Sequence, residues 1–134
     1  MIVDSSAVVA IAFREPSADQ LVRALVGAES VGIAAPTWVE TSMVLAASGL
    51  RDPAGFLERF GLEFRVESIP FTADHARTAI DAWQRFGRGN HAARLNFGDC
   101  LAYAAARVAG QPLLYVGNDF AQTDIEPALG EAIS

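Results

Sequence analysis

Residues 1–7 read MIVDSSA, with three apolar residues before Asp4 and small residues after it. A short apolar run of this kind is typical of a buried strand, and residues 5–13 have helical character. Three further strands are expected at 31–35, 64–69 and 113–116, with a short last strand at Ile125. Helices are expected at 17–27, 36–49, 52–61, 72–83 and 99–109. This alternation predicts an α/β fold with a central parallel sheet and helices on both faces.

The length and composition favour one domain without a membrane segment. The chain has 134 residues, of which 51% are hydrophobic, but many of these are alanines. No run approaches the roughly 18 uncharged apolar residues that a membrane span needs. The start lacks the basic region of a signal peptide and carries an acid at Asp4. We therefore expect a cytoplasmic protein that does not interact with membranes.

The inventory of reactive side chains excludes several classes of enzyme. Cys100 is the only cysteine, and His75 and His91 are the only histidines, so a thiolate or histidine zinc centre is not expected. All ten basic residues are arginines, which excludes P-loop NTPases, Schiff-base enzymes and receiver domains, because these need a lysine. Any metal would be held mainly by carboxylates, a ligand set that favours Mg²⁺ or Mn²⁺.

Four acidic residues occupy places where a site is expected. In open parallel sheets, sites form at the carboxyl ends of the strands. Asp4 ends the first expected strand, Glu40 lies one turn into the helix after the second, and Asp119 follows the fourth. Asp99 opens the alanine-rich helix. Carboxylates gathered beside buried segments repel one another, and a divalent cation would keep them ionised.

Each acid also has an ordinary structural interpretation. Asp4 and Asp99 would serve as helix caps, Asp119 as a turn residue and Glu40 as a solvated helix residue. For Glu40 and Asp119, taken singly, the ordinary interpretation is the stronger one. The combination of the four acids favours a metal site.

Four segments of the chain resemble VapC-type PIN-domain ribonuclease toxins. They are MIVDSSA at the start, APTWVE ending at Glu40, LNFGDCLAYA around Asp99, and LLYVGNDF followed by TDI around Asp119. The resemblance covers nearly the whole chain. It implies a single PIN domain over residues 1–134, with a three-layer α/β/α fold.

The resemblance also implies an activity and a set of site residues. The activity is Mg²⁺-dependent endonucleolytic hydrolysis of RNA, with Mn²⁺ as a substitute. By position, Asp4 and Asp99 are the metal ligands, and Glu40 and Asp119 complete the catalytic set. Asn118 and Asp124 are nearby polar candidates, and Ser6 is expected to support Asp4 through a hydrogen bond.

Two protein partners follow from the same resemblance. One is a VapB-type antitoxin whose C-terminal segment covers the active site. The other is a second copy of the chain in a homodimer. The apolar helix faces that would form the dimer interface, or alternatively belong to the core, carry Trp38, Met43, Val44, Phe56 and Phe60.

The formal net charge of −6 argues against non-specific binding to nucleic acid. Residues 82–98, however, contain Arg85, Arg88 and Arg94 and no acid. The arginines of this segment would contact RNA phosphates, or they are merely solvated. Because non-specific affinity for RNA should be weak, we expect selectivity for a structured RNA or an RNA loop.

Three rival functions remain at this point. The first is a PIN domain that binds a partner without cutting, which the intact set of four acids disfavours. The second is an aspartyl phosphatase, which the absence of lysine and the presence of Ser6 two residues after Asp4 disfavour. The third is a nuclease of the same fold that acts on DNA, which the sequence leaves open.

Overall fold

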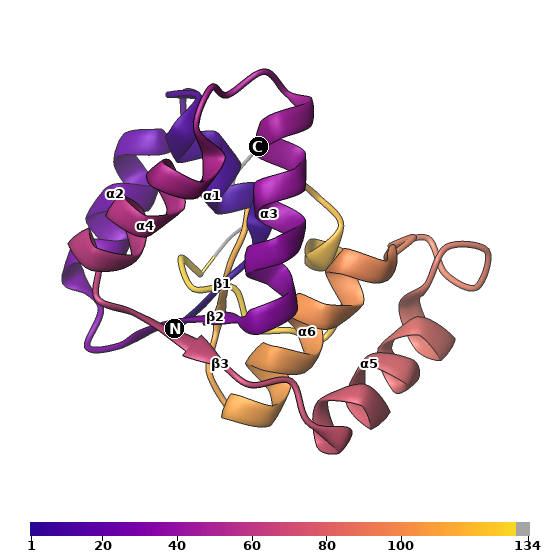
Figure 1. Ribbon diagram of the computed structural model, residues 1–134. Coiled ribbons are helices and arrows are strands. Elements are labelled where there is room, and N and C mark those ends of the chain that lie inside the picture. The colour runs from indigo at the N-terminus through magenta and orange to yellow at the C-terminus, as the bar shows by residue number, and fades with distance from the viewer. Residues whose placement is uncertain (131–134) are drawn as a thin grey trace.

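The computed structural model describes residues 1–130, and a central parallel sheet organises them (Figure 1). The four strands are β1 (Ile2–Val3), β2 (Val31–Ala34), β3 (Val66–Ile69) and β4 (Leu113–Leu114). Their order in the sheet is β3-β2-β1-β4, and every pair is parallel. Because β2 and β4 flank β1, the first strand is central and its carboxyl end lies where the strand order reverses, the usual place for a site in such sheets.

Within residues 1–130, six α-helices and one short 3₁₀ helix connect and cover the strands. They are α1 (Ser5–Ala12), α2 (Ala18–Gly27), α3 (Ala35–Ala47), α4 (Pro53–Glu63), α5 (Ala73–Phe86), α6 (Phe97–Ala109) and η1 (Phe120–Gln122). None of the helices within residues 1–130 is long and apolar enough to span a membrane.

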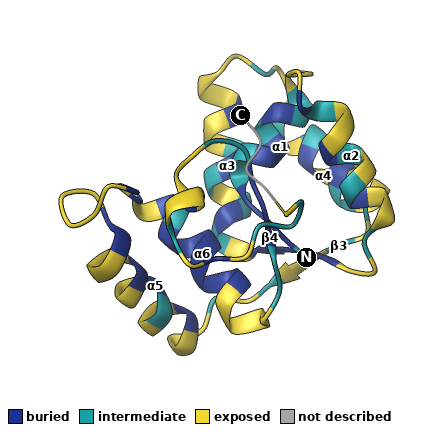
Figure 2. Ribbon diagram, turned by 180° about the vertical axis from the view of Figure 1, so that it is seen from behind, coloured by how far each residue is buried: buried dark blue, intermediate teal, exposed yellow. Residues whose placement is uncertain are grey.

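Alternation of side chains along the strands produces two hydrophobic cores, one on each face of the sheet. Ile2, Ala34 and Leu113 pack with α5 and α6 on one face. Val3 and Ile33 pack on the other face with residues of α1 to α4. The expected three-layer α/β/α architecture is therefore confirmed. Figure 2 shows that α6 is buried along most of its length, whereas α5 exposes its outer side.

The expected elements are present, but several of their ends differ. The alanine-rich helix begins at Phe97, not at Asp99, because Asn96 caps it and accepts a hydrogen bond from the Asp99 amide at 2.9 Å. The last strand expected at Ile125 is absent. There, Leu113 and Pro127 form only an isolated parallel bridge, in which the Leu113 amide donates to the Glu126 carbonyl at 2.9 Å and the Ala128 amide donates to the Leu113 carbonyl at 2.8 Å.

Candidate active site

Asp4 is the most buried of the four acids, with 2% of its surface exposed. Its backbone amide donates to the Leu114 carbonyl at 2.9 Å, which places it between β1 and β4. Its side chain caps α1, since Oδ2 accepts from the Ser6 amide at 3.0 Å. The predicted support from Ser6 is thus present through the backbone, and the Ser6 hydroxyl accepts from the Val116 amide at 3.0 Å.

Burial raises the pKa of the Asp4 carboxyl, and the charge of Asp119 raises it further, while hydrogen bonds from Ser6 and Ser5 oppose the rise. The other carboxylate oxygen, Oδ1, is buried and has no hydrogen-bond partner within residues 1–130. A buried ionised oxygen without a donor is costly, and a bound cation would remove that cost.

Glu40 reaches the same place from α3, which starts directly after β2. Burial and the charge of Asp4 raise the pKa of Glu40, and a hydrogen bond from the Ser5 side chain opposes them. Its Oε1 is also buried without a partner among the described residues. Its Oε2 lies so close to Gly98 that a Cβ there would be 1.6 Å away. The start of α6 therefore has to carry a glycine for Glu40 to hold its position.

Asp99 is the third residue of α6 and is half-buried. Burial raises its pKa to about 7; the Asn96 hydrogen bond opposes this, and the charges of Asp4, Asp119 and Glu40 reinforce it. Asp99 Oδ2 accepts from the Asn96 amide at 3.0 Å, which fixes the side chain in a reciprocal capping box.

Asp119 precedes η1 and is exposed, and its charge acts on both Asp4 and Asp99. The structure thus brings all four predicted acids close enough for the charges of the other three to act on Asp99. In the present arrangement, residues 1–130 contain no group of three Asp, Glu, His or Cys side chains close enough together to hold a metal ion.

The two looser candidates lie elsewhere or play another role. Asp124 is bound to Arg85 at 2.8 Å, to Arg107 at 2.6 Å and to the Tyr103 hydroxyl at 2.6 Å. Burial alone would raise the Asp124 pKa, but these three hydrogen bonds lower it to about 2. Asp124 therefore ties the segment after η1 to α5 and α6. Asn118 is exposed.

Sequence reasoning missed two residues that hold the acids in place, namely Asn96 and Gly98. Asn96 was recognisable, because an asparagine three residues before an acid is a helix-capping pattern. Gly98 gave no local signal, since its importance depends on the packing of α3 against α6.

The donor set fits a hard divalent cation. It consists only of carboxylate oxygens, two of which, on Asp4 and Glu40, are buried without a partner among the described residues. Such oxygens are the ligands that Mg²⁺ prefers. The mutual rise in pKa means that each ionised carboxylate destabilises its neighbours until positive charge is supplied.

A family model described as the PIN domain matches residues 1–126 of the chain. The chain belongs to the PIN-domain family. Among curated proteins, this PIN domain is 47% identical over 127 residues to ribonuclease VapC36 of Mycobacterium tuberculosis, with 94% of this chain and 91% of the relative covered. It is 40% identical over 129 residues to ribonuclease VapC42 of the same organism, covering 96% and 98% of the two chains.

Solved structures resemble this PIN domain in fold. One is M. tuberculosis VapC20, described as a toxin that cleaves the sarcin–ricin loop, with a TM-score of 0.74 and 19% identity; the match covers 92% of this chain and 95% of that chain. Another is a toxin–antitoxin complex from Klebsiella pneumoniae, with a TM-score of 0.67, 17% identity and 92% of both chains covered. At these identities the likeness supports the fold alone.

Proposed function

We propose that this PIN domain is an endoribonuclease, the toxin of a VapBC toxin–antitoxin pair, acting in the cytoplasm as one domain of residues 1–134. The observation that carries this is the convergence of Asp4, Glu40, Asp99 and Asp119 at the carboxyl edge of the sheet, with burial and mutual repulsion raising carboxyl pKa values. Identity of 47% and 40% to proteins named VapC ribonucleases supports RNA as the substrate.

Asp4 and Asp99 would hold a Mg²⁺ ion, for which Mn²⁺ would substitute. When bound, such an ion lowers the pKa of a coordinated water and offsets charge on the phosphoryl oxygens. Binding requires the carboxylates to move toward one another. Glu40, whose carboxylate lies against Gly98, would complete the set of acidic residues from α3.

The remaining groups bind and orient the substrate. Asp119, which is exposed, would orient the attacking water. No protein nucleophile is needed, and burial raises the pKa of the Cys100 thiol to about 11, so that it stays protonated. Cys100 is thus a packing residue.

Two arginines of the loop before α6 are available for RNA phosphates. Arg85 is committed to Asp81 and Asp124, but Arg88 and Arg94 form no ion pair with any residue in 1–130. They stand on the segment that leads directly to Asp99, so a phosphate bound there would lie near the acids. This local positive charge would counter the repulsion that an acidic protein exerts on RNA.

A VapB-type antitoxin is the second proposed partner. A site whose carboxylates are partly desolvated and repel one another is stabilised by any cation placed among them. A basic side chain from the C-terminal segment of an antitoxin would supply that charge and block the site at the same time.

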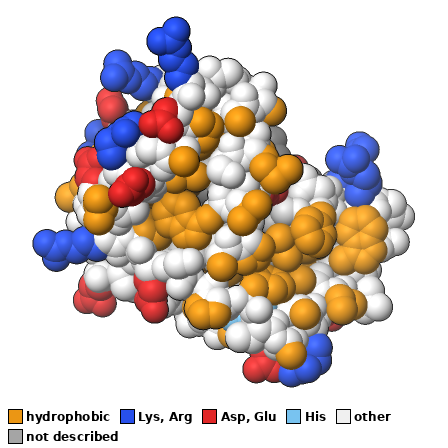
Figure 3. Space-filling model, viewed as in Figure 1, with side chains coloured by type: hydrophobic (Ala, Val, Ile, Leu, Met, Phe, Trp, Pro, Cys, Tyr) orange, Lys and Arg blue, Asp and Glu red, His pale blue; other side chains and the backbone are white. Residues whose placement is uncertain are grey.

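A homodimer is also proposed, through an apolar face where α3, α5 and α6 meet (Figure 3). Val39 and Met43 on α3, Ile80 on α5 and Phe97 on α6 are 58–79% exposed there. The sequence had suggested a different set, in which Met43 and Val44 are indeed exposed but Phe60 is buried in the core. Two acidic chains would meet with least repulsion on a face almost free of charge.

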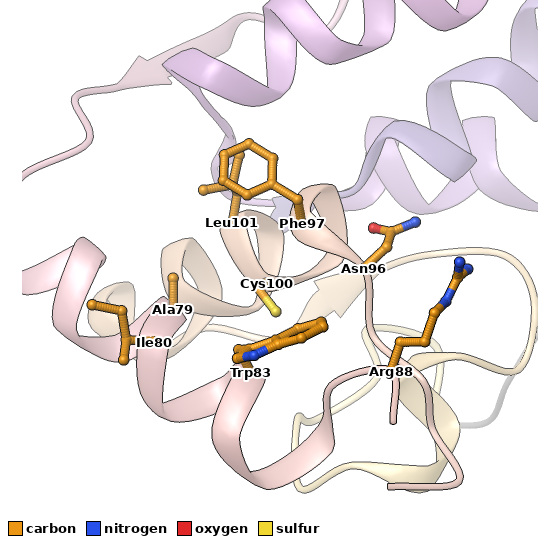
Figure 4. A pocket seen from close by; sticks show the side chains of 8 residues that line it. All are labelled: Ala79, Ile80, Trp83, Arg88, Asn96, Phe97, Cys100 and Leu101. Atoms are coloured by element: carbon orange, nitrogen blue, oxygen red, sulfur yellow. The ribbon is translucent and has the colours of Figure 1, made fainter. Parts of the chain in front are cut away.

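The same face is hollowed between α5 and α6 by a pocket of about 510 Å³ (Figure 4). Trp83 forms one wall, the Cys100 sulfur points toward the Trp83 ring, and Arg88 stands at the rim. An apolar side chain of the second copy would fill this hollow.

The nuclease is tested by incubating the purified protein with RNA and Mg²⁺ or Mn²⁺. Cleavage should need the metal and stop with EDTA, and Asp4→Asn and Asp99→Asn should each abolish it. Asp74→Asn is the matched control, since Asp74 is an exposed acid on α5 paired only with Arg77. If the folded wild type cuts none of a panel of structured RNAs under any metal condition, a binding module becomes the better interpretation.

The dimer is tested by light scattering on Met43→Asp and Ile80→Asp. Both should yield monomers, whereas Val26→Asp, at an equally exposed apolar residue on α2, should not change the mass. A monomeric wild type would contradict the proposal.

A further inference from the structure

Three buried polar side-chain atoms have no hydrogen-bond partner within residues 1–130. They are Asp4 Oδ1, Glu40 Oε1 and the Thr37 hydroxyl. Buried polar groups in proteins nearly always have a partner, so an unpaired one calls for an explanation such as a bound water or ion. The two carboxylate oxygens belong to the acidic site. Thr37 is the one of the three that carries no charge.

The fold puts Thr37 on the same helix face as Glu40, near the strand end that carries Asp4. Thr37 is in the first turn of α3 and precedes Glu40 by three residues, so the two side chains share one face of the helix. Ile2 pairs with Gly32, which brings the end of β1, and with it Asp4, next to the end of β2, where α3 starts. The charge of Asp4 acts on Glu40 across this gap. All three unpaired atoms therefore come from two adjacent strand ends.

Thr41 shows what a buried threonine in this helix otherwise does. It lies one turn after Thr37, is fully buried, and its hydroxyl donates to the Thr37 carbonyl at 2.6 Å. This bond to the preceding turn is the common way in which a helical threonine satisfies its hydroxyl. Thr37 is 1% exposed and makes no such bond among the described residues. Its hydroxyl therefore remains available to a group outside the protein chain.

We propose that Thr37 is a positioning residue of the acidic site, whose hydroxyl hydrogen-bonds a water molecule shared with Asp4 Oδ1 and Glu40 Oε1 and thereby supports binding of the ion that Asp4 and Asp99 would hold. This inference rests on the metal-dependent function proposed above. A hydroxyl donates one hydrogen bond and accepts others, and an ordered buried water needs two to four polar partners. Asp4 Oδ1, Glu40 Oε1 and the Thr37 hydroxyl supply three. Thr37 would thereby orient the water and raise affinity for the ion without touching it.

The test is the affinity for Mn²⁺ of the full chain in the absence of RNA, measured by calorimetry and by the metal-induced rise in Tm. Thr37→Val keeps the shape and removes the hydroxyl. We expect its metal-free Tm to be equal to or above that of the wild type, because an unpaired buried hydroxyl has been removed. Its Kd for Mn²⁺ should rise about tenfold or more, as for other groups that orient metal ligands.

Two variants separate positioning from packing. Thr37→Ser restores the hydroxyl and should recover the affinity of the wild type. Thr41→Val removes an equally buried hydroxyl from the same face and should leave the Kd for Mn²⁺ unchanged. A wild-type Kd in Thr37→Val would overturn the inference, as would equal weakening in Thr37→Val and Thr37→Ser. If the folded wild type binds no Mn²⁺, the metal-dependent function fails, and the inference fails with it.

Discussion

Gly98 occupies a position where no side chain fits, because the Glu40 carboxylate already fills the space next to its Cα. A Cβ at residue 98 would lie 1.6 Å from Glu40 Oε2 and 2.5 Å from its Cδ. Gly98→Ala must therefore push Glu40 away from Asp4 and Asp99. We expect kcat for RNA cleavage to fall at least tenfold, about 1.4 kcal/mol in activation free energy, while the protein stays folded by circular dichroism.

Gly27→Ala is the control for this substitution. Gly27 ends α2, and a Cβ there meets no atom within 4 Å. It should leave kcat unchanged. Wild-type cleavage by Gly98→Ala would show that Glu40 is not held by this contact or does not contribute to the reaction.

The raised pKa of Asp99 predicts how stability depends on pH. An aspartate has a pKa of about 3.9 in unfolded chains, whereas burial raises that of Asp99 to about 7 in the fold. Between these values the folded state binds more protons than the unfolded state, so stability falls as the pH rises. The metal-free Tm should therefore drop between about pH 4 and about pH 7, and Asp99→Asn should flatten this dependence.

Divalent metal should reverse this trend. Its ligands must be ionised, so the rise in Tm caused by Mg²⁺ should be larger near pH 8 than near pH 5. Scanning calorimetry of the protein with EDTA or with Mg²⁺ measures both effects. A metal-free Tm that rises over this range would contradict the assignment.

Asp124 should contribute to stability more than to catalysis. Asp124→Asn weakens its ion pairs with Arg85 and Arg107 and its hydrogen bond from Tyr103. Because these groups are partly exposed, we expect a loss of only about 1 kcal/mol in the free energy of unfolding, measured by urea titration, with kcat within about twofold of wild type. Asp74→Asn, which breaks one exposed pair with Arg77, should cost less. Loss of cleavage without loss of stability would place Asp124 in the site after all.

Ser6 joins the start of α1 to the segment that follows β4. Its hydroxyl accepts a hydrogen bond from the Val116 amide at 3.0 Å, across 110 residues of sequence. Ser6→Ala leaves that amide unpaired, at a cost of about 1–3 kcal/mol, and loosens the segment that carries Asp119. We expect a lower free energy of unfolding in urea titrations and a lower rate of RNA cleavage. Ser42→Ala, whose hydroxyl bonds only locally to Val39 on an exposed surface, should change neither.

The sequence was sufficient to predict the architecture, and it singled out the four acids as candidates. Apolar runs separated by helical patterns indicate a parallel sheet, and the strand-end rule then gathers Asp4, Glu40 and Asp119. The start of α6 was placed two residues late, because the polar character of Asp99 was taken for a cap although Asn96 performs that role. The strand expected at Ile125 was wrong, because pairing with β4 in this segment is limited to the single bridge between Leu113 and Pro127.

Contacts across elements could not be predicted in the same way. The segment before α6 was expected to offer three arginines, yet Arg85 is committed to Asp124, which is 39 residues away in the sequence. The role of Gly98 depends on where Glu40 lies, and the unpaired hydroxyl of Thr37 depends on which carbonyls it can reach. Such features are set by three-dimensional packing and leave no periodic pattern in the chain.

The pairing of β1 with β4 has a consequence for how the protein is made. A ribosome releases the chain from its N-terminus, but β1 lies between β2 and β4, and β4 consists of Leu113 and Leu114. Asp99 and Asp119 also belong to the part of the chain that is synthesised late. A half-translated chain therefore contains Asp4 and Glu40 but neither a finished sheet nor a complete set of acids. The nuclease would become competent only after β4 and Asp119 have been translated, so a nascent chain that ends before them would carry no active toxin.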